Sequence, residues 1–221
     1  MSFPLNREIS HRVTPWLAKL RLSPNQVTGL SLCAGMVAAW NFFQGGPSHW
    51  LVGALWLQVS YILDNCDGEL ARMTGRSSGF GSWLDTIVDC IIHMAFFYSL
   101  GMGMYRHHPN PLWVRLSFIA VGGVFLTYLT YVLEQVQLRG KSAWVHPDPP
   151  NGSEGLRFWG KLRKVFREDF SFVVLGSALA QHVSWLLWSG IFGSFFIGFS
   201  SMLAIAVRGK RLLAGFDRSR R

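Results

Sequence analysis

The chain concentrates its acidic residues in one short segment, because five of its twelve acids lie between positions 64 and 89. Four of them are the aspartates Asp64, Asp67, Asp85 and Asp89. Carboxylates this close together repel one another unless protons or divalent cations neutralise them. Oxygen ligands without histidine or cysteine favour a hard ion, Mg²⁺ or Mn²⁺. Two such ions could be held, and two-metal sites stabilise the attacking and leaving oxygens of a phosphoryl displacement.

The spacing of these aspartates predicts two facing pairs on neighbouring helices. Asp64 and Asp67 are three residues apart, and Asp85 and Asp89 are four apart, so each pair lies on one face of its helix. If the two helices are antiparallel and turn near Arg76, Asp64 lies level with Asp89, and Asp67 lies level with Asp85. With a rise of about 1.5 Å per residue, Asp89 lies roughly 12 Å into the second helix. The spacing therefore predicts a carboxylate cluster near one end of both helices.

The composition is that of a membrane protein. Half of the residues are hydrophobic, only 15% are charged, and the chain has 10 Trp and 17 Phe, which excludes a disordered or collagenous chain. The net charge of +9 could indicate nucleic-acid binding, but a basic chain this apolar points to a membrane first. No nucleic-acid partner is therefore expected. The three cysteines have no CxxC spacing and support neither a disulfide framework nor a zinc site.

Six apolar segments are long enough to cross a membrane, since a span needs about 20 residues. Residues 170–207 contain no Lys, Arg, Asp or Glu and are predicted to form two spans joined by a turn near residues 182–189. Four earlier spans are predicted at residues 25–44, 50–73, 81–105 and 111–137. The predicted fold is therefore all-α, an integral membrane bundle of six transmembrane helices with an N-terminal amphipathic surface helix.

The distribution of Lys and Arg predicts the orientation of the bundle. One set of loops and both ends of the chain are basic, whereas the other set contains only Arg106 and Arg115. Basic loops lie on the cytoplasmic side, so both termini and the active site are expected there. The aspartates then lie in the cytoplasmic third of the membrane. Inserting an ionisable residue at mid-depth costs about 2.5–3.5 kcal/mol, so four aspartates inside the membrane indicate a function. Small size and the lack of a targeting segment favour a prokaryotic plasma membrane.

Three regions are expected along the chain. Residues 1–22 are predicted to form a juxtamembrane helix on the cytoplasmic membrane surface, because apolar residues recur there at helical spacing. An ordinary amphipathic packing helix is the alternative. Residues 23–207 contain the six spans, with a polar, Gly- and Pro-rich cytoplasmic loop at 138–167, and residues 208–221 form a basic cytoplasmic tail. The apolar residues of the first region are Leu5, Ile9, Val13, Trp16, Leu17 and Leu20.

The acidic segment resembles the signature of the CDP-alcohol phosphotransferase family, DxxDGxxAR followed after eight residues by GxxxDxxxD. Every fixed position matches, at Asp64, Asp67, Gly68, Ala71, Arg72, Gly81, Asp85 and Asp89. The six spans, the surface helix and the opening of the first span at Pro24, Asn25 and Thr28 extend the resemblance over most of the chain.

The resemblance implies a membrane enzyme, usually homodimeric, that uses Mg²⁺ or Mn²⁺. Such an enzyme transfers a substituted phosphate from a CDP-alcohol to an acceptor hydroxyl and releases CMP. By position, Asp64, Asp67 and Asp85 would be metal ligands, while Asp89 would close the metal site and act as general base. The CDP pocket would be lined by Gly68, Ala71, Arg72 and Gly81, with Asn25 and Thr28 touching the nucleotide from the first span.

The resemblance favours CDP-diacylglycerol as the lipid donor and a small polar alcohol or polyol phosphate as the acceptor. A phosphorylated acceptor, such as glycerol 3-phosphate or inositol phosphate, would need cations at the cytoplasmic mouth, and the candidates are Arg139, Lys141 and Arg167. The positive-inside bias or contact with anionic lipid also accounts for such residues. His93, four residues after Asp89, either orients that carboxylate or packs between helices.

Two other functions are compatible with acidic residues inside a membrane. Intramembrane prenyltransferases bind isoprenoid diphosphates through Mg²⁺, but they need a second aspartate motif, and no acidic residue lies between Asp169 and Asp217. A cation or proton transporter is the non-enzymatic alternative. Transporters usually contain repeated halves with interrupted helices, whereas this sequence has one copy of its motif. The phosphotransferase is therefore the favoured function.

Overall fold

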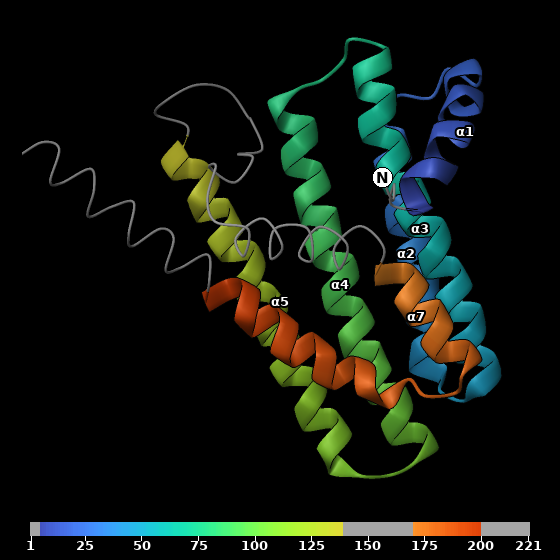
Figure 1. Cartoon of the computed structure of the whole chain (residues 1–221), viewed down its shortest axis with the longest axis vertical. Helices are drawn as coiled ribbons and strands as arrows, with labels where there is room; N and C mark the ends of the chain where they lie inside the picture. Colours follow the sequence, from blue (N-terminus) through green and yellow to red (C-terminus); the bar gives the residue numbers. More distant parts are fainter. Residues whose placement is uncertain (1–4, 139–169, 200–221) are drawn as a thin grey trace, which may run out of the picture.

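A computed structural model describes residues 5–138 and 170–199, and these residues form helices without any strand (Figure 1). The predicted all-α fold is confirmed for this part of the chain. Six labelled helices are α1 (Leu5–Lys19), α2 (Pro24–Gln44), α3 (Pro47–Met73), α4 (Gly79–His107), α5 (Pro111–Leu138) and α7 (Phe170–Leu179). A last helix, Ser184–Phe199, follows α7 and crosses in front of α4 and α5 in Figure 1.

Prolines and capping side chains fix where the helices begin. Pro24, Pro47 and Pro111 lie in the first turn, where a missing N–H costs no hydrogen bond. Ser23 and Gln26 form a capping box at the start of α2. The Ser23 Oγ atom accepts from the Gln26 N–H at 3.3 Å, and the Ser23 N–H donates to Gln26 Oε1 at 2.8 Å. These local signals explain why the first four predicted spans agree with α2 to α5 within a few residues.

The turn before the last helix lies earlier than predicted. The chain reverses at residues 180–183, where Gln181 adopts a positive φ of 56°. Ser189, predicted to end the turn, lies inside the last helix, and its hydroxyl donates to the Leu186 carbonyl at 3.0 Å. The turn was predicted too late in the chain, because residues 180–183 include neither glycine nor proline.

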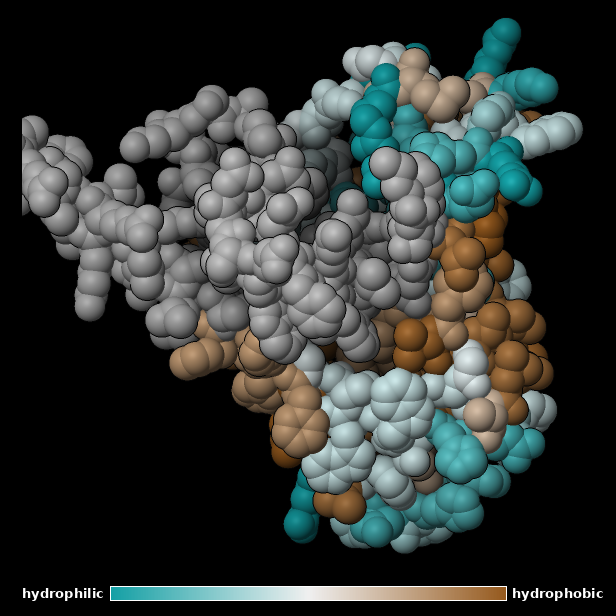
Figure 2. Space-filling view, in the orientation of Figure 1, coloured by the Kyte–Doolittle hydropathy of each residue, from teal (hydrophilic) through white to brown (hydrophobic). Residues whose placement is uncertain are grey.

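Two described helices, α4 and the Pro111–Leu133 part of α5, are long and apolar enough to cross a membrane. α7 and the last helix are shorter apolar helices within the described residues. The visible face in Figure 2 has a hydrophobic band between two hydrophilic ends. Large apolar side chains remain exposed on several helices, among them Trp40, Phe118, Phe125 and Phe192. Exposed apolar surface of this extent is typical of contact with lipid or with another protein.

The two helices that carry the aspartates are both supported by α2. α3 and α4 each pack extensively against α2, and α4 also packs against α5, whereas the direct contact between α3 and α4 is slight. Fully buried apolar side chains, including Phe42, Leu57, Phe96, Leu100 and Leu186, fill the core between these helices and the last one. The acidic halves of α3 and α4 are therefore positioned relative to each other mainly through their shared packing on α2.

α1 packs on the bundle through a polar stripe and through some of its apolar residues. Asn6, Ser10 and Thr14, spaced by four residues, are buried, whereas Leu5 is 58% exposed and Trp16 is 69% exposed. The half-buried Val13 and Leu17 pack against the cluster formed by Val27, Cys66 and Leu70. The predicted helix is present and packs on the bundle, as the alternative interpretation expected, while its contact with a membrane surface stays a prediction.

Substitution of Gly103 in α4 is expected to destabilise the protein, because an added Cβ would collide with the Phe42 carbonyl oxygen at the end of α2. Backbone cannot move aside as a side chain does, so Gly103→Ala should lower the free energy of unfolding by about 1–3 kcal/mol. Thermal unfolding in detergent measures the loss. Gly122→Ala is the matched control, since its Cβ would meet no atom within 4 Å. Equal midpoints for the two variants would contradict the close packing.

Candidate active site

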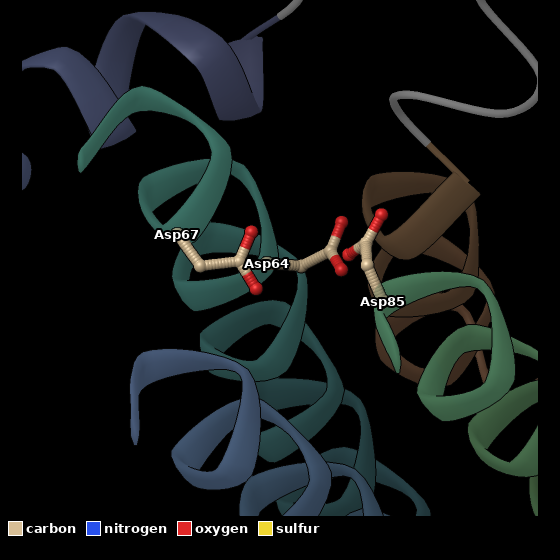
Figure 3. Close-up of side chains that lie close together, drawn as sticks. All are labelled: Asp64, Asp67 and Asp85. Carbon is tan, nitrogen blue, oxygen red and sulfur yellow. The ribbon is translucent and has the colours of Figure 1, made fainter. Parts of the chain in front are cut away.

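Three of the four predicted aspartates come together between α3 and α4. Asp64, Asp67 and Asp85 each offer a carboxylate oxygen, and these oxygens lie within 4.8 Å of one another. In Figure 3 the side chains of Asp64 and Asp85 point toward each other from the two helices, and Asp67 lies beside them on α3. The predicted approach of the α3 pair to Asp85 is confirmed. Oxygens at these separations could coordinate one divalent cation without rearrangement of the backbone.

Asp64 has a carboxylate oxygen in the cluster that no described donor satisfies. Its Oδ1 atom is buried and receives no hydrogen bond from the described residues, and neither Asp64 nor Asp67 forms an ion pair there. Asp64 is repelled by Asp89 as well as by Asp85 and Asp67. Asp89 thus lies near the cluster, although it is outside the group of three. A buried carboxylate oxygen without a donor is a fitting ligand for a cation.

Thr28 orients one of the three carboxylates. Its hydroxyl lies 2.5 Å from Asp67 Oδ2, and both side chains are buried. The same hydroxyl is 3.1 Å from the Pro24 carbonyl in the first turn of α2. The sequence predicted that Thr28 belongs to the site, but as a nucleotide contact. The structure instead places the Thr28 hydroxyl against Asp67. Side chains that hydrogen-bond a metal ligand in this way usually fix the orientation of that ligand.

The remaining motif residues surround the cluster at the same end of the bundle. A Cβ on Gly68 would lie 3.5 Å from the Arg72 guanidinium, so this cation folds back over the glycine at the end of α3. A Cβ on Gly81 would lie 3.5 Å from Asn25 Oδ1 of α2. Ala71 is half-buried on the last turns of α3. Gly68 and Arg72 therefore lie together on α3, and Gly81 of α4 lies beside Asn25 of α2, while a role of these residues in binding CDP stays a prediction.

His93 links three helices one turn beyond Asp89. Its Nε2 atom is 2.7 Å from the Tyr61 hydroxyl of α3, and its Nδ1 atom is 3.2 Å from the Tyr128 hydroxyl of α5. Nδ1 also lies 2.8 Å from the Asp89 backbone carbonyl. The interhelical packing considered for His93 is thus present. Tyr61 and Tyr128 had no signal in the sequence, since their partner lies more than thirty residues away in each case.

Two further observations concern residues near the cluster. Glu69, two residues after Asp67, is buried and hydrogen-bonded to α1, although the sequence suggested no role for it. A glutamate within a predicted span was itself a signal, because such residues are rarely buried without partners. The candidate acceptor residues Arg139, Lys141 and Arg167 lie outside the described residues.

The fold and the acidic centre together define a helical protein with a carboxylate site for a divalent cation. The family model described as CDP-alcohol phosphatidyltransferase matches residues 21–196. The chain therefore belongs to the CDP-alcohol phosphatidyltransferase family, as its motif predicted.

Curated relatives share part of the chain. A bifunctional IPC transferase and DIPP synthase of Aquifex aeolicus is 34% identical over 57% of this chain and 28% of its own length. A phosphatidylinositol phosphate synthase of Cutibacterium acnes is 28% identical over 61% of this chain and 64% of its own length. The chain thus matches about a quarter of the length of the bifunctional relative.

Solved structures of a phosphatidylinositol phosphate synthase from Mycobacterium tuberculosis share the fold. The structure with CDP-DAG bound has a TM-score of 0.58 and 21% identity, and the match covers 91% of this chain and 92% of the other. The structure in complex with manganese and citrate has a TM-score of 0.56 and 21% identity, and the match covers 87% of this chain and 83% of the other. The arrangement of helices is therefore shared by an enzyme of this family.

Proposed function

We propose that the protein is a CDP-alcohol phosphotransferase that transfers the phosphatidyl group of CDP-diacylglycerol to a hydroxyl of a small polar alcohol or polyol phosphate. The observation that carries the proposal is the meeting of Asp64, Asp67 and Asp85 at the fixed positions of the family motif. The similar synthase from Mycobacterium tuberculosis binds CDP-DAG, which supports this donor. Several relatives are phosphatidylinositol phosphate synthases, which supports inositol phosphate as the acceptor to test first.

The residues present fit Mg²⁺ or Mn²⁺. Asp64, Asp67 and Asp85 would hold the ion, Asp89 would complete a site for a second ion, and the partnerless Oδ1 atom of Asp64 is the observation that favours a cation. The manganese in the similar synthase agrees with this donor set. When bound, such ions neutralise the diphosphate and the departing CMP.

The chain's own residues would bind the donor and move one proton. The Arg72 guanidinium beside Gly68 would hold a phosphate oxygen, and Asn25 and Gly81 would form the opposite wall of the CDP pocket together with Ala71. The acceptor oxygen would form a bond to the phosphorus that carries the diacylglycerol. The bond from that phosphorus to the CMP oxygen would break. Asp89 would take the proton of the attacking hydroxyl.

The proposed setting is a prokaryotic plasma membrane crossed six times within residues 23–207. The hydrophobic band in Figure 2 supports a membrane, and the sparse charge of one set of loops supports a cytoplasmic active site and cytoplasmic termini. α1, within the proposed surface segment 1–22, would rest its exposed Leu5, Trp16 and Leu20 in the lipid headgroup region. Residues 208–221 would form the basic tail. Homodimerisation through an exposed apolar helix face is also proposed.

Thr28→Val should weaken Mn²⁺ binding about tenfold, because it removes the hydroxyl behind Asp67 without changing the side-chain shape. Mn²⁺ titration followed by electron paramagnetic resonance gives the dissociation constants. Thr130→Val is the matched control, since the Thr130 hydroxyl is buried but bonds only within α5, to the Thr127 carbonyl. If the two variants bind Mn²⁺ equally well, Thr28 does not act through Asp67.

CMP release by purified protein in detergent tests the proposed function. The protein is incubated with Mg²⁺, CDP-diacylglycerol and one acceptor at a time, including inositol phosphate, glycerol 3-phosphate and serine. CMP formed with one acceptor and abolished by EDTA is the expected result. Silence with every acceptor while CDP-diacylglycerol still binds would contradict the acceptor class, and failure to bind any CDP compound would contradict the function itself.

A further inference from the structure

A buried glutamate joins α1 to the helix that carries two of the aspartates. Glu69 is only 5% exposed, and both of its oxygens accept hydrogen bonds from α1. The Ser10 hydroxyl donates to Oε1 at 2.7 Å, and the Thr14 hydroxyl donates to Oε2 at 2.7 Å. His11 Nδ1 lies 3.3 Å from Oε1 at the edge of this contact. A glutamate is rarely buried so deeply unless its charge is matched by donors, as it is here.

Glu69 and the metal-site aspartates occupy opposite faces of α3. Residues two positions apart are about 200° apart around a helix, so Glu69 faces α1 while Asp67 faces Thr28 of α2. The Cys66 thiol adds a weak contact to the Ser10 carbonyl at 3.8 Å on the α1 side. The last turns of α3 are therefore bonded to α1 on one side and to α2 on the other.

The contact with α1 matters because the backbones of α3 and α4 make slight contact, although the Tyr61 hydroxyl and His93 form a hydrogen bond between them. The carboxylates of the two helices must converge to hold one cation. The rotation of α3 about its axis then sets the distance from Asp64 and Asp67 to Asp85. Metal and reaction sites need positions held within about 0.5 Å, and a displacement of about 1 Å can lower a rate by about a hundredfold.

We propose that Glu69 is a positioning residue, which through Ser10 and Thr14 of α1 fixes the rotation of α3 and so the geometry of the aspartate cluster. The inference rests on the proposed function, since it concerns the affinity of the same site for its metal. It gives α1 a role in the site although no α1 residue belongs to the cluster. Glu69 thus connects the docked α1, which also contacts α3 through Asn6 and Val13, to the aspartate cluster.

Mn²⁺ affinity, measured by electron paramagnetic resonance on the full chain in detergent, tests the inference. Glu69→Ala should raise the dissociation constant about tenfold and lower CMP release in parallel. Glu69→Gln should stay within about threefold of the wild type, because the side-chain shape remains. The amide oxygen can still accept from one of the two hydroxyls. The other hydroxyl can turn its proton to its own α1 carbonyl, Arg7 for Ser10 or Ser10 for Thr14, and accept from the amide NH₂ group. If Glu69→Ala does not fold, the single change Thr14→Val should weaken Mn²⁺ binding about threefold.

Two comparison variants separate positioning from general destabilisation. Thr127→Val removes a hydrogen bond of 2.8 Å to the Ser194 carbonyl, which joins α5 to the last helix, and should lower the thermal midpoint without changing Mn²⁺ affinity. Glu8→Gln removes an exposed charge on α1 that pairs with Arg12 in the described part of the chain, and it should change neither quantity. Unchanged Mn²⁺ affinity in folded Glu69→Ala and Thr14→Val proteins, or an equal loss in Thr127→Val, would overturn the inference. No Mn²⁺ binding by the wild type would instead overturn the proposed metal site from which it follows.

Discussion

Asp85→Asn is expected to weaken Mn²⁺ binding more than about a hundredfold and to abolish CMP release at ordinary Mn²⁺ concentrations. The variant removes the only α4 carboxylate in the described group of three, while Asp64 and Asp67 remain on α3. Loss of a partner behind a metal ligand already lowers affinity by about 10–100-fold, and loss of a direct ligand should exceed that. Mn²⁺ titration by electron paramagnetic resonance measures the affinity, and chromatography of the nucleotide products measures turnover.

Glu8→Gln serves as the charge control for Asp85→Asn, since Glu8 is an exposed carboxylate on α1. It should retain wild-type affinity and activity. Asp85→Asn should also keep or raise its thermal midpoint in the absence of metal, because it removes one of several repelling charges. Tight Mn²⁺ binding by a folded Asp85→Asn protein would place the metal somewhere other than the aspartate cluster.

Asp89→Asn is expected to separate metal binding from catalysis. Asp89 lies outside the group of three, yet close enough to repel Asp64, as expected of a general base beside the metal-bound centre. Removing a general base lowers a rate by about 10²–10⁴-fold. CMP release should fall by that factor, whereas the dissociation constant of the first Mn²⁺ should change by less than about tenfold.

Cys90→Ala is the comparison for Asp89→Asn. Cys90 is the next residue of α4, and its thiol contacts Met94 within the same helix at 3.6 Å. This variant should retain turnover within about threefold. If Asp89→Asn lost Mn²⁺ entirely, Asp89 would be an indispensable ligand, and the base would have to be sought elsewhere.

The acidic centre could be predicted from sequence because helices are periodic. Spacings of three and four residues place side chains on one face, and an antiparallel pair brings Asp67 level with Asp85. The structure confirms that approach, and it draws Asp64 into the same group. Helix starts were also predictable, because Ser23, Pro24 and Pro47 act on the residues beside them.

The contacts behind the aspartates could not be predicted in the same way. Thr28 meets Asp67 across 39 positions, and Ser10 meets Glu69 across 59. Nothing local distinguishes these side chains from other polar residues in helices, since their partners are set by how α1 and α2 pack on α3. The apolar pattern of α1 predicted the helix but not its buried polar residues, because Asn6, Ser10 and Thr14 are bonded to partners on other helices.

The fate of the phosphate next to the diacylglycerol tests the central claim most directly. CDP-diacylglycerol labelled with ³²P at that position is incubated with the protein, Mg²⁺ and the acceptor that supports CMP release. A phosphatidyl transfer at the Asp64, Asp67 and Asp85 centre predicts label in the new phospholipid and unlabelled CMP. Label recovered in a cytidine nucleotide product or in free phosphate would contradict transfer of the phosphatidyl group to the acceptor hydroxyl.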